Sequence, residues 1–110
     1  MFENKLASYT GFKHAIAVDC CTNGILLACE LLNRFGLLYK KCGLSMSKWT
    51  YMSVPMTLRN NGWDIRLIDD KWTQSYEIGN ANIYDAATDL HANMHDDYAN
   101  FDRCMVCVSF

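Results

Sequence analysis

Short apolar runs of strand length alternate along this chain with stretches in which apolar residues recur at helical spacing. The candidate strands are 14–18, 44–47, 65–68 and 104–110, and a short strand-like piece, 82–84, leads into Asp85. The candidate helices between them are 22–35 and 54–60. This alternation favours an α/β fold in three layers, with a mostly parallel sheet and helices on both of its faces.

Residues 22–35 carry the clearest helical pattern. One apolar face consists of Ile25, Cys29 and Leu32, broadened by Leu27, Leu31 and Phe35. Threonine often caps the N-terminus of a helix, so Thr22 is expected at its start. Glycine often ends a helix, so Gly36 is expected just beyond its C-terminus. A second, more polar helix is predicted over 2–9, with Gly11 beyond its end.

The length of the chain limits it to one domain. With 110 residues, 51% of them hydrophobic, residues 1–110 can build one packed core and are too few for two ordinary domains. Ten Lys and Arg against twelve Asp and Glu give a net charge of -2. That balance excludes nucleic acid and an anionic membrane surface as expected partners.

The six cysteines do not predict a disulfide framework. Cys29 lies inside a helical pattern, and neither a signal peptide nor an apolar run long enough to span a bilayer occurs in the sequence. We therefore expect reduced thiols and a cytoplasmic location.

The carboxyl ends of parallel strands meet at one edge of an α/β sheet, where ligands bind in such folds. The residues expected at this edge are Asp19 to Thr22, Trp49 to Tyr51, Asp69, Asp85 and Ser109. The start of helix 22–35 suits an anion there, because free backbone N–H groups and the helix macrodipole favour negative charge. An aromatic side chain suits a flat ring, and a carboxylate suits a protonated ring nitrogen.

Four segments occur in the order in which a known enzyme family has them. They are 6–24, with Asp19-Cys20-Cys21-Thr22-Asn23-Gly24 at its end; Trp49-Thr50-Tyr51 followed by Gly62 and Asp69; Tyr84-Asp85-Ala86-Ala87-Thr88; and Val108-Ser109-Phe110. Over nearly its whole length the chain resembles the DegT/DnrJ/StrS family of sugar aminotransferases, which are pyridoxal-phosphate enzymes of fold-type I. The resemblance implies a reduced version of the large domain of that fold.

The resemblance also implies the cofactor pyridoxal 5'-phosphate and the residues that bind it. These are Cys21, Thr22, Tyr51, Asp85, Thr88 and Ser109. Asp85 would keep the ring nitrogen protonated, which makes the ring an electron sink. Tyr51 would stack on the ring, and Thr88 would reach the ring hydroxyl. The remaining three residues would hold the phosphate at the helix N-terminus.

By resemblance, the activity is transfer of an amino group from glutamate to a keto sugar attached to a nucleotide. The family's catalytic lysine follows the segment that corresponds to Ser109-Phe110, so the resemblance covers the cofactor-binding part and is truncated before that lysine. Transamination needs this amine. We therefore expect no catalysis from the chain alone, and association as a homo-oligomer or with a partner chain that supplies the lysine.

Two departures from the family pattern bear on the cofactor site. Cys21 stands in place of a glycine that lets the backbone approach the phosphate closely. Residues 70–84, between Asp69 and Asp85, are too few for the strand and helix that relatives insert there. We expect one βα unit to be missing.

Two other interpretations remain open. One is a non-catalytic relic that binds the cofactor or a nucleotide sugar weakly, or contacts a homologous partner. The other is a thiol-based metal or redox module, since Cys104 and Cys107 form a C-x-x-C pair, although positions three apart on a strand face opposite sides. His91 and His95 fit a solvated polar segment better than a metal site. Taken alone, Asp85 is more typical of a helix cap.

Overall fold

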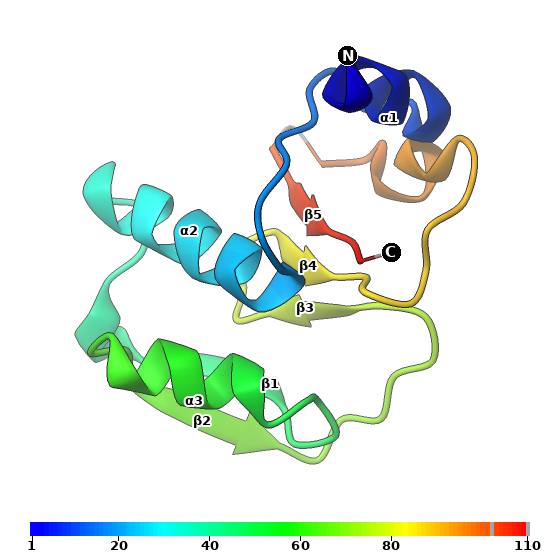
Figure 1. Cartoon of the computed structure of the whole chain (residues 1–110). Coiled ribbons are helices and arrows are strands. Elements are labelled where there is room, and N and C mark those ends of the chain that lie inside the picture. The colour runs from blue at the N-terminus through cyan, green and yellow to red at the C-terminus, as the bar shows by residue number, and fades with distance from the viewer. Residues whose placement is uncertain (102, 110) are drawn as a thin grey trace.

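The computed structural model describes residues 1–101 and 103–109 of the chain. The described residues form, in order, α1 (Phe2–Thr10), α2 (Cys21–Arg34), η1 (Lys40–Cys42), β1 (Leu44–Ser47), α3 (Ser53–Asn60), β2 (Ile65–Ile68), β3 (Tyr76–Ile78), β4 (Ile83–Asp85), η2 (Met94–Tyr98) and β5 (Met105–Cys107), where η marks a 3-10 helix (Figure 1). The predicted α/β class is confirmed. None of the described helices is long and apolar enough to cross a membrane.

The described strands form two small sheets instead of the single sheet that the sequence predicts. β1 and β2 pair in parallel, with Leu44 opposite Ile65. β3 and β4 form an antiparallel hairpin, and β5 pairs in parallel with β4. The hairpin turn contains Gly79 and Asn82, both at positive φ, so the chain folds straight back and has no crossover helix at this point.

The two sheets meet at Gly79. Its backbone N–H donates a hydrogen bond of 2.6 Å to the carbonyl oxygen of Ser45 on β1. A Cβ atom at this position would lie 3.0 Å from Cδ2 of Leu44, which is a fully buried side chain. Only a residue without a side chain allows the two sheets to approach this closely.

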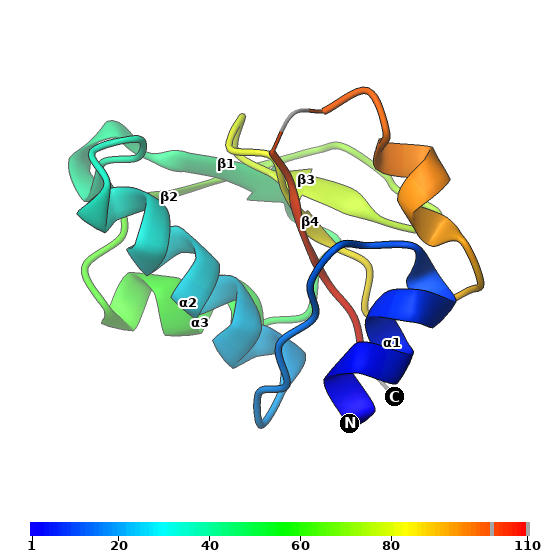
Figure 2. The ribbon, with the colours of Figure 1, turned by 90° about the horizontal axis from the view of Figure 1, so that it is seen from above.

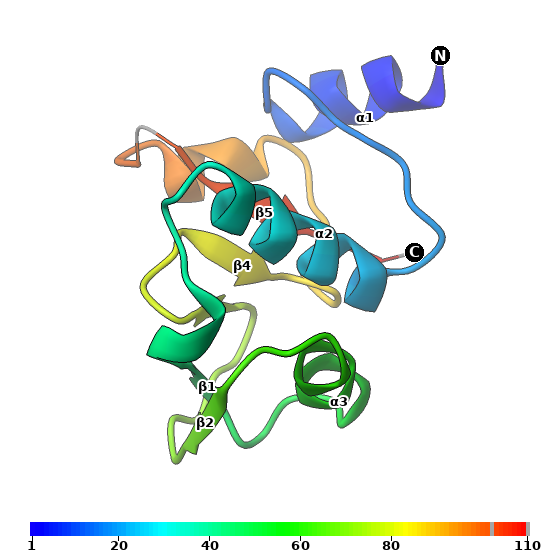
Figure 3. The ribbon, with the colours of Figure 1, turned by 90° about the vertical axis from the view of Figure 1, so that its left-hand side faces the viewer.

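The helices cover the sheets unequally. Figure 2 shows α2 and α3 together on one side of the strands, and Figure 3 shows α3 lying against β1 and β2. α2 packs on one face of β4 and β5, while α1 and η2 lie on the other face (Figure 2). Three layers therefore occur around β4 and β5.

Two hydrophobic clusters correspond to the two faces of β4 and β5. The main cluster consists of Ile25, Ala28, Cys29, Leu44, Met46, Val54, Leu58, Trp63, Ile65, Tyr76, Ile78 and Ile83. The smaller cluster of Ala86, Met94 and Tyr98 packs against Phe12, Tyr84, Leu90, Cys104, Val106 and Val108. Alternate residues of each strand enter different clusters, as the period of two requires.

Two predicted strands differ from the structure, and one observed strand was not predicted. Residues 14–18 form no strand: Ile16 is 80% exposed, and no strand of the described residues pairs with this loop, whose Ala17 N–H instead donates a hydrogen bond of 2.7 Å to Glu3 Oε1. The predicted strand 104–110 shortens to β5, and Phe110 lies outside the described residues. β3 was not predicted, because three residues in a polar stretch carry little pattern.

The predicted helix 22–35 differs at its start and in its buried face. Cys20 is the N-cap residue and no side chain caps the helix, so Thr22 is not the cap. Leu27, Leu31 and Phe35 are exposed and do not widen the buried face, which in α2 consists of Ile25, Ala28 and Cys29. The packed stripe of α2 is thus narrower than its sequence suggests.

Candidate functional site

Asp85, the last residue of β4, is the centre of the candidate site. It is 7% exposed, and its carboxylate accepts hydrogen bonds from three groups of this chain. The Tyr76 hydroxyl donates to Oδ2 at 2.9 Å, the Ala87 N–H donates to Oδ1 at 3.1 Å, and the Cys21 thiol donates to Oδ1 at 3.8 Å. A buried carboxylate needs such donors, since burial without them is costly.

Tyr76 faces Asp85 because the hairpin register pairs the two residues directly. Its ring is buried and packs against the ring of Trp72 at a centroid distance of 5.0 Å. Burial raises the pKa of Tyr76, and the negative charge of Asp85 acts in the same direction. The phenol therefore stays protonated at neutral pH and acts as a donor.

Thr50 extends this arrangement to the loop between β1 and α3. Its hydroxyl is hydrogen-bonded to the Tyr76 hydroxyl. Since Tyr76 uses its proton on Asp85, Thr50 is the donor in this bond. A continuous chain of hydrogen bonds thus runs from Thr50 through Tyr76 to Asp85.

Cys21 brings the start of α2 to the same carboxylate. Its thiol contacts Cys107 of β5 as well as Asp85, and the contact with Cys107, burial and the charge of Asp85 all raise the pKa of Cys21. The thiol is therefore a protonated donor and a poor nucleophile. All six cysteines lie among the described residues and are free thiols.

The first turn of α2 has backbone N–H groups without acceptors inside the helix, as every helix does. The hydroxyls of Thr22 and Ser53 are hydrogen-bonded at 3.1 Å, and Ser53 is the first residue of α3. Asp19 lies at the same helix end: its carboxylate accepts from the Cys20 N–H and from the side chain of Asn23, and these bonds lower its pKa. An anion bound here would share the helix end with Asp19.

The other predicted cofactor residues lie at the surface. Tyr51 is 76% exposed, and Thr88 and Ser109 are also exposed. None of the three makes a side-chain hydrogen bond with another described residue. The structure thus brings Cys21 and Asp85 into contact and leaves Tyr51, Thr88 and Ser109 outside that contact.

Asp69 belongs to a different edge from Asp85. It follows β2, and its carboxylate accepts from the Trp49 indole N–H at 3.0 Å and pairs with the Lys48 ammonium at 3.3 Å. The predicted single edge is therefore divided between the two sheets.

Tyr76 and Thr50 were not among the predicted site residues. Thr50 lies inside the quoted Trp49-Thr50-Tyr51 segment without a role of its own. For Tyr76 the available signal was the alternation of Tyr76 and Ile78 before Gly79, which is typical of a hairpin strand. A hairpin prediction would have placed Tyr76 opposite Asp85.

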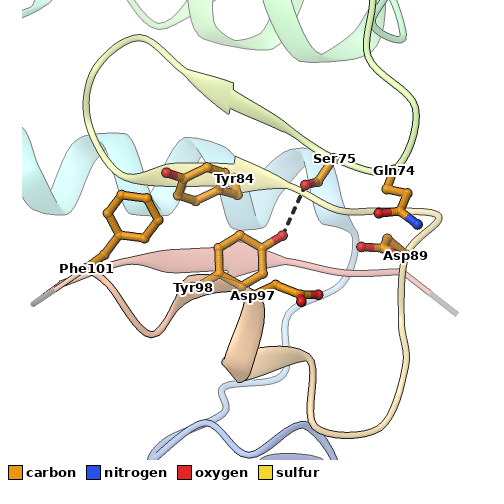
Figure 4. A pocket seen from close by; sticks show the side chains of 7 residues that line it. All are labelled: Gln74, Ser75, Tyr84, Asp89, Asp97, Tyr98 and Phe101. Carbon is orange, nitrogen blue, oxygen red and sulfur yellow. Dashed lines mark hydrogen bonds between the residues drawn. The ribbon is translucent and has the colours of Figure 1, made fainter.

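A separate cavity of about 330 Å³ lies on the other face of β4 (Figure 4). Its lining consists of Gln74, Ser75, Tyr84, Asp89, Asp97, Tyr98 and Phe101. The Tyr98 hydroxyl donates to Ser75 Oγ at 3.1 Å across it (Figure 4). Asp85 does not line this cavity.

The two histidines weighed as a metal pair are separated by the fold. His91 Nε2 lies 3.1 Å from Asp97, and its Nδ1 lies 3.4 Å from Asp89. Partial removal of water from the His91 ring lowers its pKa. The backbone carbonyl of Asp89 and the carboxylates of Asp89 and Asp97 have a larger, opposite effect, so the pKa of His91 is raised. His95 packs edge-on against Phe12 instead, with ring centroids 5.0 Å apart.

Comparison with protein families matches most of this chain to a known family. The family model of the DegT/DnrJ/EryC1/StrS aminotransferases matches residues 1–90, a span that includes Cys21, Thr50, Tyr76 and Asp85. Comparison with curated proteins and with solved structures gives no match.

Proposed function

Because the chain belongs to the DegT/DnrJ/EryC1/StrS aminotransferase family, we propose that it is the cofactor-binding portion of a pyridoxal-phosphate-dependent aminotransferase of the nucleotide-sugar type. The reaction would transfer an amino group from glutamate to a keto sugar. The observation that carries this proposal is the buried carboxylate of Asp85, held at a strand end beside the start of α2. We further propose that the two sheets are a reduced fold-type I large domain.

The donors around Asp85 leave it the capacity to accept one more hydrogen bond, as from a ring nitrogen. A carboxylate has about four lone-pair positions, and three are used by Tyr76, Ala87 and Cys21. The contact with Cys21 is the longest of these and the easiest to give up. One oxygen of Asp85 can therefore accept a further proton donor, which is the contact that a protonated ring nitrogen requires.

The start of α2 supplies the second half of the proposed site. Its backbone N–H groups favour a phosphate, and the Thr22 hydroxyl can turn from Ser53 to an anion. Tyr51 and Ser109 are exposed and therefore accessible to a ligand. When bound, pyridoxal phosphate would supply an electron sink for a carbanion at the substrate carbon, and Asp85 would hold the proton on the ring nitrogen.

The amine of the reaction is the part that residues 1–110 do not match. Among the six lysines, Lys40 pairs with Glu30 and Lys48 pairs with Asp69, away from Asp85. We propose that a polypeptide of residues 1–110 alone has no transaminase activity, and that an amine from outside these residues completes the site.

One observation favours a second candidate function. The chain's own donors already satisfy much of the hydrogen-bonding capacity of Asp85, so this carboxylate can serve the fold alone. In that case the protein is a non-catalytic relative that contacts a homologous partner.

The experiment that separates these functions is a titration of the purified protein with pyridoxal 5'-phosphate, followed by absorbance and fluorescence. Asp85→Asn keeps the shape of the side chain and removes its charge. Asp69→Asn is the matched control, because Asp69 also follows a strand but belongs to the other sheet. Saturable binding that is lost only in Asp85→Asn supports the cofactor site. Binding that is absent, or equal in all three proteins, would contradict a cofactor site at Asp85.

A further inference from the structure

The strongest unassigned feature of the site is the partly buried chain of hydroxyls that leads from Thr50 through Tyr76 to Asp85. Tyr76 donates to Oδ2 of Asp85, and Thr50 is hydrogen-bonded to Tyr76. The family resemblance assigned no role to Tyr76 or Thr50, and both lie within the span that the family model matches.

We propose that Tyr76 is a positioning residue, which orients the Asp85 carboxylate toward the ring nitrogen of a bound pyridoxal phosphate. Thr50 supports it by fixing the Tyr76 hydroxyl. This inference rests on the proposed function, since it concerns the same site.

The hydrogen bonds around Asp85 show how Tyr76 can orient its carboxylate. Ala87 fixes Oδ1 through the backbone at 3.1 Å, while Tyr76 fixes Oδ2 at 2.9 Å from the neighbouring strand. A carboxylate anchored at both oxygens from two separate segments cannot rotate freely about its own axis. Its free lone pair then has one direction, which is a condition for a directional bond to a ring N–H.

The support from Thr50 comes from outside the hairpin. Thr50 follows β1 in the chain and immediately precedes Tyr51, the residue expected to stack on the ring. The hydroxyl chain therefore ties the loop with the stacking residue to the residue that would meet the ring nitrogen. The two contacts expected for the ring are linked through Thr50 and Tyr76.

Losing the Tyr76 hydroxyl removes a hydrogen bond to a charged group. Because this bond is present with and without the cofactor, its loss acts on binding only through the orientation of Asp85, and we expect Tyr76→Phe to weaken pyridoxal phosphate binding about tenfold. Thr50→Val, which keeps the shape of the side chain, is expected to weaken it by a smaller factor in the same direction. Tyr84→Phe is the matched control, because Tyr84 precedes Asp85 on the same strand and packs in the cluster on the other face.

The test uses two ligands: pyridoxal 5'-phosphate, and an analogue in which a C–H group replaces the ring nitrogen. Tyr76→Phe should weaken the first about tenfold and leave the second unchanged, because only the first bonds to Asp85. Equal losses for both ligands would mean that Tyr76 only supports the fold. An affinity equal to that of wild type would overturn the proposal as well.

A pH titration of the bound cofactor's absorption gives a second readout. A well-oriented carboxylate stabilises the protonated ring nitrogen, so the absorption change should move to lower pH in Tyr76→Phe. An unchanged midpoint contradicts the inference. A different result would contradict the proposed function itself: no binding of pyridoxal phosphate by the wild-type protein, or equal binding by the wild-type protein and Asp85→Asn. Because the role of Tyr76 depends on that function, this result would overturn the inference too.

Discussion

Replacing Gly79 with alanine is expected to loosen the junction of the two sheets. Gly79 has a φ of 58°, and an added Cβ would lie 3.0 Å from Leu44 Cδ2. Leu44 is 1% exposed and cannot move aside without disturbing the main cluster. The substitution therefore combines an unfavourable backbone conformation with a steric overlap.

Gly36→Ala is the matched control for this experiment. Gly36 also has a positive φ, of 71°, but its added Cβ would meet only the Tyr39 hydroxyl, at an ordinary distance of 3.6 Å. The left-handed conformation alone costs about 1 kcal/mol for alanine, and overpacking in a filled core adds about 1–3 kcal/mol. We expect Gly79→Ala to lower the free energy of unfolding by about 2–4 kcal/mol and Gly36→Ala by about 1 kcal/mol.

Urea denaturation of both variants, followed by circular dichroism, measures this difference. A single domain of this size has a stability of about 5–15 kcal/mol, so the larger loss is readily seen in the midpoint. Equal losses in the two variants would refute the close approach of the sheets at Gly79. The Gly79→Ala loss would then reflect the backbone conformation alone.

Three further predictions follow from the same contacts. Cys21→Gly should tighten binding of pyridoxal phosphate in the titration, since it frees Asp85 and the helix end, whereas weaker binding would show that the Cys21 side chain itself contributes to binding. Glu30 accepts hydrogen bonds from Lys40 and from the Trp63 indole, and these lower its pKa. Its carboxylate therefore stabilises the folded protein at pH values above its unfolded pKa of about 4.3, and this stabilisation is lost as the pH falls through its folded pKa. Glu30→Gln should therefore show a smaller loss of stability between neutral and acidic pH in urea denaturation, and an unchanged acid dependence would contradict this. Finally, β5 is an open edge of its sheet, and light scattering should detect self-association of the isolated protein; a clean monomer at high concentration would count against it.

The parts of the fold that the sequence predicted well are those with a strong period and a clear end. β1 and β2 have the predicted bounds, and α3 begins one residue before its prediction and ends at Asn60 as expected. In each case apolar residues at the correct spacing are followed by a glycine or a polar residue. Local pattern and tertiary structure agree at these elements.

The errors in the predicted strands have one physical origin, which is strand pairing. Residues 14–18 are as apolar as a buried strand, but a strand needs a partner, and the partner is not encoded in the segment itself. The short β3 has its partner in β4, only a turn away, and forms despite its polar surroundings. Since pairing is a property of two segments, a pattern read along one segment misses it.

The site shows the same limit. Cys21 and Asp85 were expected near each other because helix starts and strand ends share an edge, and they lie in contact. Tyr76 was missed because its role depends on the hairpin register. The cofactor roles of all six predicted residues stay predictions: Cys21, Thr22, Tyr51, Asp85, Thr88 and Ser109.

The central claim is that Asp85 holds a protonated ring nitrogen of pyridoxal phosphate. The most direct measurement is the NMR chemical shift of an isotopically labelled ring nitrogen in the cofactor bound to this protein, compared with the cofactor free at the same pH. We expect a protonated nitrogen in the wild-type protein and a neutral one in Asp85→Asn. A neutral nitrogen in the wild-type complex, or no bound signal at saturating protein, would contradict it.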